Sequence, residues 1–271
     1  MAGEILSASV FLPRRNPVIT ADVEEAFWGL SGAGFAPDHA GSLRIANERR
    51  TPMVSGETKD ARVFQGAVDI DQAIRLLRRV PADYWGQVML RGQFSLGGQF
   101  EDVTAIVCPF SSEDPGVFSA HLMFRKAGLL LEDRPAPQRA VHALEALDRL
   151  QDSTAPILAF LDVNPPNIEG SDLRVARFPW LPWAGYASPG AAARMGGGAF
   201  LKLAEWVPWL EKQLNAPGAG AARQTRGGGY LWALPSPLLG RRPPEGAGSG
   251  TLQLWYNYLE NLVAPRMRVF D

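Results

Sequence analysis

The strongest constraint on the fold is a run of three β-rich segments joined by short turns. The segments cover residues 86–95, 100–110 and 116–128. They are separated by Gly97-Gly98 and by Glu113-Asp114-Pro115-Gly116, which are typical turn sequences. Because connections this short favour neighbouring strands that run in opposite directions, the pattern predicts an antiparallel arrangement.

Segments with helical periodicity flank these strands. Residues 20–32 begin with Thr20 as a candidate N-cap, and residues 68–81 begin with Asp69 in the same role. Residues 136–151 predict a further amphipathic helix. The side chains expected to face inward are Val23, Phe27 and Leu30 in the first helix, Ile70, Ile74 and Leu77 in the second, and Val141, Leu144, Leu147 and Leu150 in the third.

The remaining segments are assigned from alternation, turn residues and composition. Strands are expected at residues 4–12 and 155–163, and the stretch between residues 35 and 60 is expected to be mainly loop with one short helix. The later part of the chain is rich in Pro, Gly and Trp. It is expected to hold a helix at 199–214, a strand within 227–236, a surface loop at 241–250 and a closing helix at 251–265.

Strands and helices in this order predict an α+β fold. We expect a mainly antiparallel sheet with helices packed mostly on one face. The chain has 271 residues, of which 46% are apolar, and this is enough to bury a large core. The sequence therefore predicts a single globular domain over residues 1–271, or two tightly packed halves, 1–152 and 153–271, that join near Asp152.

Composition argues against several classes of partner. A formal net charge of −1 does not fit a protein that neutralises many nucleic-acid phosphates. The first residues do not resemble a signal peptide, and no stretch supplies about 18 uninterrupted apolar residues. We therefore expect a cytoplasmic protein that binds neither nucleic acid nor membrane.

Metal and cofactor sites are not expected either. Cys108 is the single cysteine, which excludes an intrachain disulfide and a four-cysteine zinc site. The histidines, His39, His121 and His142, lack the local spacing of metal ligands. The triplet Gly196-Gly197-Gly198 is followed by Ala199-Phe200 where a phosphate-binding loop needs Lys and Ser or Thr, so a turn or helix entry is the expected reading.

Three residues are the candidates for catalysis. Cys108 and His121 lie in neighbouring predicted strands and can form a thiol–imidazole dyad, because such residues need only meet in space. Asp162 follows at the end of a predicted strand, where a carboxylate can act as a base. The alternative is structural: a buried cysteine, a hydrogen-bonded histidine and a turn-forming aspartate are ordinary features of folded proteins.

Aromatic and arginine residues concentrate in the second half of the chain. Trp, Tyr and Arg often anchor protein interfaces, because each combines a large contact area with a polar group. Most of the aromatic residues are expected in the core, with one or two at the surface. The candidates for partner binding are Trp180, Trp183, Tyr186, Arg194, Trp206, Trp209, Arg226 and Trp232.

A resemblance extends from about residue 175 to residue 263. It rests on the order of "PWLPWAGYASP", "AFLKLAEWVPWLEKQL", "RGGGYLWALPSP" and a terminal helix. In this order the segment resembles immunity proteins of bacterial polymorphic-toxin and type VI secretion systems. The resemblance implies a cytosolic protein that neutralises a toxin by binding it, without catalytic residues.

Two functions are therefore weighed. The preferred one is a bacterial interaction protein that neutralises a protein toxin through an aromatic and arginine surface. The alternative is a hydrolase or transferase with a dispersed active site around Cys108, His121 and Asp162. An enzyme needs titratable groups that converge in one cleft, whereas a binding protein is expected to expose an apolar patch rimmed by charge.

Overall fold

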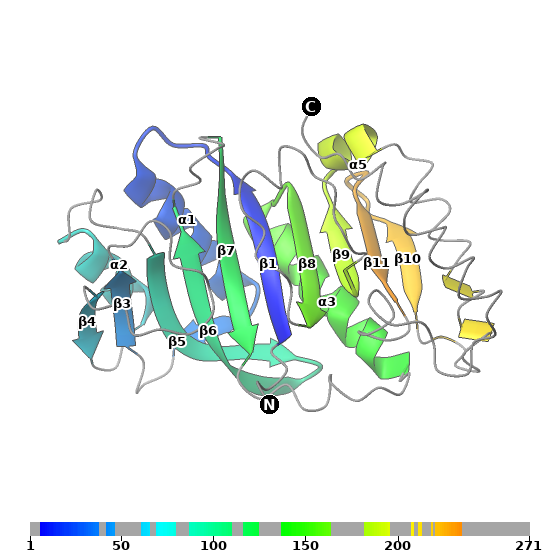
Figure 1. The fold of residues 1–271 in the computed structure, drawn as a ribbon, viewed down its shortest axis with the longest axis horizontal. Coiled ribbons are helices and arrows are strands. Elements are labelled where there is room, and N and C mark those ends of the chain that lie inside the picture. Colours follow the sequence, from blue (N-terminus) through cyan, green and yellow to red (C-terminus); the bar gives the residue numbers. More distant parts are fainter. Residues whose placement is uncertain are drawn as a thin grey trace.

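An antiparallel sheet of eleven strands forms the centre of the protein (Figure 1). The computed structural model describes residues 6–37, 42–46, 61–65, 69–79, 87–109, 116–124, 137–163, 182–195, 207–208, 211–212, 218 and 220–234. The strand order is β10-β11-β9-β8-β1-β7-β6-β5-β3-β4, and β2 also pairs with β5. The strands are β1 Leu6–Pro13, β2 Phe35–Pro37, β3 Ser42–Ala46, β4 Ala61–Gln65, β5 Gln87–Leu96, β6 Gln99–Cys108, β7 Val117–Phe124, β8 Leu158–Val163, β9 Ala184–Ala187, β10 Ala221–Gln224 and β11 Tyr230–Ala233.

Helices pack mostly on one face of this sheet. The described helices are α1 Ile19–Gly32, α2 Ile70–Leu77, α3 Pro137–Thr154 and α5 Pro189–Met195. α3 contacts β5, β8, β9 and β11, and it also packs against α1, which contacts α2. Figure 1 shows α1 and α3 on the same side, behind the central strands. The expected α+β class, with an antiparallel sheet and one helical face, is confirmed.

β1 lies in the middle of the sheet, between β7 and β8. Its side chains alternate between the faces, as in any strand. Leu12 lies opposite Phe118 and lines a hollow with Ala26 of α1. Leu12 and every second residue before it in β1 therefore face the helices. The intervening positions, among them Ser9 and Phe11, point to the other face. Both sets are buried, so both faces of the strand are covered.

The strands β5, β6 and β7 confirm the predicted antiparallel arrangement. The turn between β5 and β6 uses Gly97 and Gly98, both at positive φ. His142 of α3 packs over Gly97, where a Cβ would come within 2.3 Å of Nδ1 of the ring. Gly97 is therefore required for two reasons, the positive φ of the turn and the close approach of His142 from α3.

α2 begins where the sequence predicts. Asp69 is its N-cap, and the Asp69 carboxylate accepts a hydrogen bond from the Gln72 backbone N–H at 2.6 Å. The predicted inward face, with Ile70, Ile74 and Leu77, is buried. α1 differs, because it begins at Ile19 after Val18 rather than being capped by Thr20.

Two expectations for the first half need correction, one of them only at the residues 35–37 and 42–46 that the structure describes within 35–60. The stretch expected to be mainly loop contains β2 and β3, which pair with β5. These short segments are strands because the edge of β5 supplies hydrogen-bond partners, a tertiary effect that local patterning does not reveal. Val141 was expected to face inward, yet it is 48% exposed. α3 instead places Ala140, Ala143 and Ala146 in its buried face, and their small side chains let the helix approach the sheet closely.

The second half adds strands that the sequence reading missed. The segment "PWLPWAGYASP", interpreted as a turn, contains β9, and α5 and β10 were also not expected. Gly185 of β9 lies under the indole of Trp232, so a Cβ there would meet the ring at 2.2 Å. The expected strand after Gly229 is confirmed as β11. The Gly196–Gly198 triplet, the loop at 241–250 and the helix at 251–265 lie outside the described residues, as does most of the helix at 199–214.

The described parts of the two halves share one core. β1 of the first half pairs with β8 of the second, and α3 contacts strands from both. One hydrophobic cluster extends from Leu6 to Leu234. The number of domains stays a prediction, although the sheet itself is continuous across the proposed junction.

Candidate functional site

A row of polar side chains crosses the sheet on the face opposite α1. Cys108 of β6 lies opposite Ser119 of β7, and His121 of β7 lies opposite Ser9 of β1. Because Ser119 and His121 are two residues apart on one strand, their side chains share a face. The structure thus brings Cys108 and His121 to one face of the sheet.

Serine hydroxyls link this row. Nδ1 of His121 lies 3.0 Å from Oγ of Ser9, and Nε2 lies 3.0 Å from Oγ of Ser119. Ser119 also hydrogen-bonds the Cys108 side chain. Cys108 and His121 are therefore bridged by Ser119. The edge of the imidazole packs against Phe11, with 6.4 Å between the ring centroids.

Burial keeps both titratable groups of the row neutral at pH 7. It raises the pKa of the Cys108 thiol to about 11, although the hydrogen bond with Ser119 acts in the opposite direction. It lowers the pKa of His121 to about 4. A reactive cysteine needs a lowered pKa and an accessible, electropositive environment. In this state the row is a neutral hydrogen-bonded chain rather than a thiolate–imidazolium pair.

Asp162 lies on the same face but is not the orienting partner of His121. It sits opposite Ser7 in the β1–β8 pair, whereas His121 sits opposite Ser9 in the β1–β7 pair. Both ring nitrogens of His121 already contact serines, and Asp162 is 3% exposed with interactions of its own. The three candidates therefore do not form a catalytic triad in this structure.

The aromatic residues predicted to bind a partner divide into two groups. Trp183, Tyr186 and Trp232 are buried, with exposed fractions of 1%, 6% and 1%. Nε1 of Trp183 donates to the Leu234 carbonyl at 3.0 Å, and Nε1 of Trp232 donates to the Pro182 carbonyl at 3.3 Å. These three side chains pack the core, so their prediction as surface anchors is corrected.

The other predicted partner residues keep their status as predictions. Arg226 is exposed in the turn between β10 and β11. Arg194 lies in α5, but its side chain is outside the described part of the structure. Trp180, Trp206 and Trp209 lie outside the described residues altogether.

A second polar cluster ties the β1–α1 connection to the first turns of α1. Oδ1 of Asp22 accepts hydrogen bonds from the backbone N–H groups of Arg15 and Asn16, at 3.2 and 3.0 Å. The Asn16 amide donates to the same oxygen at 2.8 Å. Arg14 approaches the other carboxylate oxygen at 3.8 Å. Asp22 thereby fixes the connection that leads into α1.

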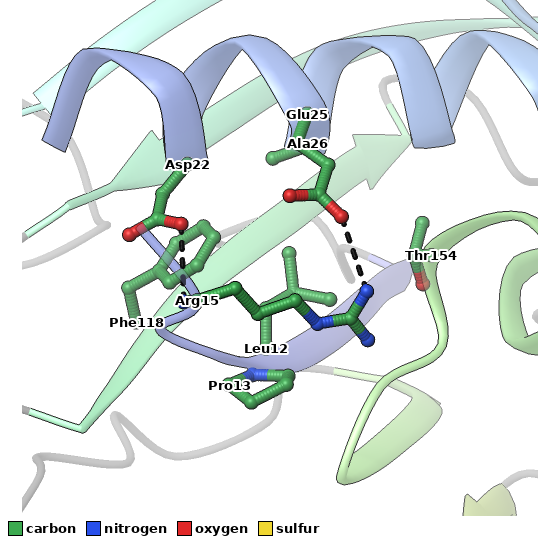
Figure 2. A pocket seen from close by; sticks show the side chains of 8 residues that line it. All are labelled: Leu12, Pro13, Arg15, Asp22, Glu25, Ala26, Phe118 and Thr154. Carbon is green, nitrogen blue, oxygen red and sulfur yellow. Dashed lines mark hydrogen bonds and ion pairs between the residues drawn. The ribbon is translucent and has the colours of Figure 1, made fainter. Parts of the chain in front are cut away.

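This cluster borders a small hollow (Figure 2). Arg15 and Glu25 lie at its rim and form an ion pair at 3.1 Å, and Leu12, Ala26 and Phe118 make it apolar. Nη2 of Arg15 also donates to the Ala155 carbonyl at 3.3 Å. Since these bonds occupy the Arg15 guanidinium, the cluster serves to join α1 to the end of α3.

One aromatic side chain is presented to solvent on α1. Trp28 is 49% exposed, in contrast to the buried Trp183 and Trp232. Glu24 lies one turn before it and forms an ion pair with Arg78 at 2.7 Å, through two hydrogen bonds. These bonds raise the pKa of Arg78, so the guanidinium stays charged. Glu25, which also precedes Trp28 by about one helical turn, forms an ion pair with Arg15.

Sequence reasoning missed both the serine bridges and Trp28, although signals for them existed. The alternation Ser119-x-His121 in a predicted strand places the two side chains on one face. Trp28 follows Phe27 directly, so at about 100° per residue it points away from the face made by Val23, Phe27 and Leu30.

Comparison of this chain with family models, curated proteins and solved structures finds no match. In the described part of the chain, no helix is long and apolar enough to cross a membrane. The same residues contain no group of three or more His, Cys, Asp or Glu side chains placed to hold a metal ion.

Proposed function

We propose that this chain is a cytosolic bacterial protein that binds a protein toxin and neutralises it by direct contact. The observation that carries the proposal is the exposure of Trp28 between two ion pairs, Glu24–Arg78 and Arg15–Glu25. An aromatic side chain rimmed by charged groups has the composition of an interface anchor.

The position of Trp28 supports this role. The buried face of α1, which includes Val23, Phe27 and Leu30, already packs in the core. Trp28 therefore adds nothing to that face and presents half of its surface to solvent. The ion pairs tie α1 to α2 and to the β1–α1 connection, so the helix that carries Trp28 is held in place before a partner arrives, which lowers the entropy lost on binding.

The test starts from the genes beside the one for this chain. We expect one of them to encode a secreted toxin, with which this chain is then co-expressed. We expect the wild-type chain to restore growth and to co-elute with the toxin as a complex. Trp28→Ala is expected to weaken the complex at least about tenfold, because interface tryptophans often contribute strongly to binding. Val141→Ala, an exposed apolar position on α3, is the matched control and is expected to leave affinity unchanged. Unrestored growth together with no complex would refute the proposal.

The alternative function is a hydrolase or transferase that uses Cys108 and His121. Its support is the bridge between them through Ser119. The neutral state of both groups argues against it, since the thiolate is the nucleophilic form. Cys108→Ser preserves the shape of the side chain and removes the sulfur. If Cys108→Ser still forms the complex with the toxin but no longer restores growth, the enzyme is favoured. If Cys108→Ser still restores growth, a cysteine nucleophile is excluded.

A further inference from the structure

Three arginines lie at the surface where α2 ends. Arg75 is in the last turn of α2, Arg78 is its C-cap, and Arg79 follows directly after the helix. All three are exposed. Arg78 is engaged by Glu24 of α1, whereas Arg75 and Arg79 form no ion pair with the described residues.

Arg78 connects this group of arginines to α1, the helix that carries the exposed Trp28. The Glu24–Arg78 ion pair joins the two helices, and Trp28 lies one turn beyond Glu24. We call Trp28, Glu24, Arg75, Arg78 and Arg79 the Trp-Arg patch. Glu24 offsets one of its three arginines, so the patch is basic overall. Asp71, one turn before Arg75, is the next acidic side chain along α2 and lies in the first turn of that helix.

We infer that the Trp-Arg patch binds an acidic segment of a partner protein that also carries an apolar side chain. The inference rests on the proposed protein-binding function and specifies the chemistry of its partner. Arg75 and Arg79 would pair with partner carboxylates, and Trp28 would cover the apolar side chain. Guanidinium groups suit this task, because they bind carboxylates through two parallel hydrogen bonds.

Charge complementarity favours this occupant. Arg75 and Arg79 are exposed and form no ion pair with the described residues, and Arg78 between them is tied to the helix that carries the half-exposed Trp28. This combination matches a carboxylate-bearing apolar peptide. A lipid surface fits less well, because the apolar face of α1 is buried in the core and is not free to insert.

The probe is a short fluorescein-labelled peptide in which Asp and Glu alternate with Leu, titrated with the full chain and followed by fluorescence anisotropy. We expect saturable binding that weakens at least about tenfold when salt is raised from about 0.05 M to 0.5 M, since exposed charges are screened. Arg75→Glu with Arg79→Glu is expected to weaken binding at least about tenfold, and Trp28→Ala about fivefold or more. Thermal unfolding of each variant checks that the fold is retained.

The matched control reverses two exposed basic side chains elsewhere, Arg91→Glu with Lys212→Glu. It changes the net charge by the same amount and is expected to leave peptide affinity within about twofold. Equal losses in the two double variants would show general charge attraction and overturn the inference. Failure of the wild-type chain to bind the peptide would overturn it as well. So would binding of a labelled oligo(dT) or of anionic vesicles in preference to the peptide.

The two proposals can fail separately. If the toxin complex forms and is insensitive to the Arg75 and Arg79 reversal, this inference is wrong while the proposed function stands. If no toxin complex forms but the peptide binds through the Trp-Arg patch, the inference stands and the proposed identity of the partner is wrong.

Discussion

His121 holds a neutral imidazole between two serine hydroxyls in the middle of the sheet. Its pKa is lowered to about 4 by burial, whereas an unfolded chain has an ordinary histidine pKa near 6.5. Above about pH 6.5 the ring is neutral in both states, and its contribution to stability is unchanged by pH. As the pH falls below that value the unfolded state takes up the proton first, so the free energy of unfolding decreases.

This shift gives the first prediction. Between about pH 7 and pH 4 the ionisation of His121 is expected to remove about 3 kcal/mol of stability, on the scale of 1.36 kcal/mol per pKa unit. His121→Gln lacks this ionisation, so its stability deficit relative to the wild type should shrink as the solution becomes acidic. Urea unfolding at several pH values measures both proteins. Curves that stay parallel would show that His121 titrates normally in the folded state.

Gly185 lets β9 pack closely against Trp232, because glycine has a hydrogen atom where other residues have a Cβ. The indole of Trp232 lies directly over it and is itself buried and hydrogen-bonded to the Pro182 carbonyl. Any Cβ at this position must displace the ring, because the nearest ring atom is 2.2 Å from where that carbon would lie.

The second prediction follows from this contact. Gly185→Ala is expected to destabilise the protein by about 2 kcal/mol or more, as overpacked positions in dense cores do. Gly190→Ala is the control, because a Cβ there meets nothing within 4 Å and the position is helical. It should be neutral or slightly stabilising, since alanine is the better helix former. Thermal or urea unfolding distinguishes the pair, and equal effects would contradict the contact.

At the scale of elements, α3 packs across much of the sheet, against β5, β8, β9 and β11. Its buried face contains Leu144, Leu147 and Leu150 together with three alanines, and it contacts strands from β5 to β11. Leu144 is 8% exposed, whereas Val141, three residues earlier, is 48% exposed. The two positions therefore test the orientation of one helix with one kind of substitution.

The third prediction compares Leu144→Asp with Val141→Asp. A carboxylate at position 144 would lose its hydration without gaining a partner, and we expect destabilisation of about 4 kcal/mol or more, enough to unfold the chain. The same residue at position 141 stays in water and is expected to cost less than about 1 kcal/mol. Circular dichroism and thermal unfolding measure both. Native stability in Leu144→Asp would show that the buried face is assigned wrongly.

For the whole molecule, the continuity of the sheet decides how the halves depend on each other. β1 has β7 on one side and β8 on the other, and α3 rests on β8, β9 and β11. Removing residues 153–271 would leave one edge of β1 unpaired and uncover the leucine face of α3.

The fourth prediction is that a fragment of residues 1–152 does not fold alone. We expect it to aggregate or to unfold without a sharp transition, because an exposed apolar strand edge and helix face favour association. Size-exclusion chromatography and urea unfolding provide the measurement. Co-expression with residues 153–271 should restore a soluble complex. A monomeric fragment with a cooperative transition would instead establish two independent domains.

Local patterns predicted the elements that carry their own sequence signal, including the alternating strands β1 and β8. The Asp69 cap, the strands around Gly97-Gly98 and the fold class all follow from short-range rules, and the structure confirms them. β2, β3 and β9 were missed because they are strands through pairing with distant segments rather than through composition. Burial of Trp183 and Trp232 was likewise invisible, because residue type does not tell which aromatic side chain the core has room for.

The central place of β1 has a consequence for how the protein is made. Ser9 and His121, neighbours in the finished sheet, are 112 residues apart along the chain. During translation β1 therefore leaves the ribosome long before either of its flanking strands is synthesised. In contrast, β5, β6 and β7 are consecutive and can pair with one another as they are synthesised. An early apolar strand without neighbours is a natural client for chaperones, and it should be the last part of the sheet to become protected in hydrogen exchange during refolding.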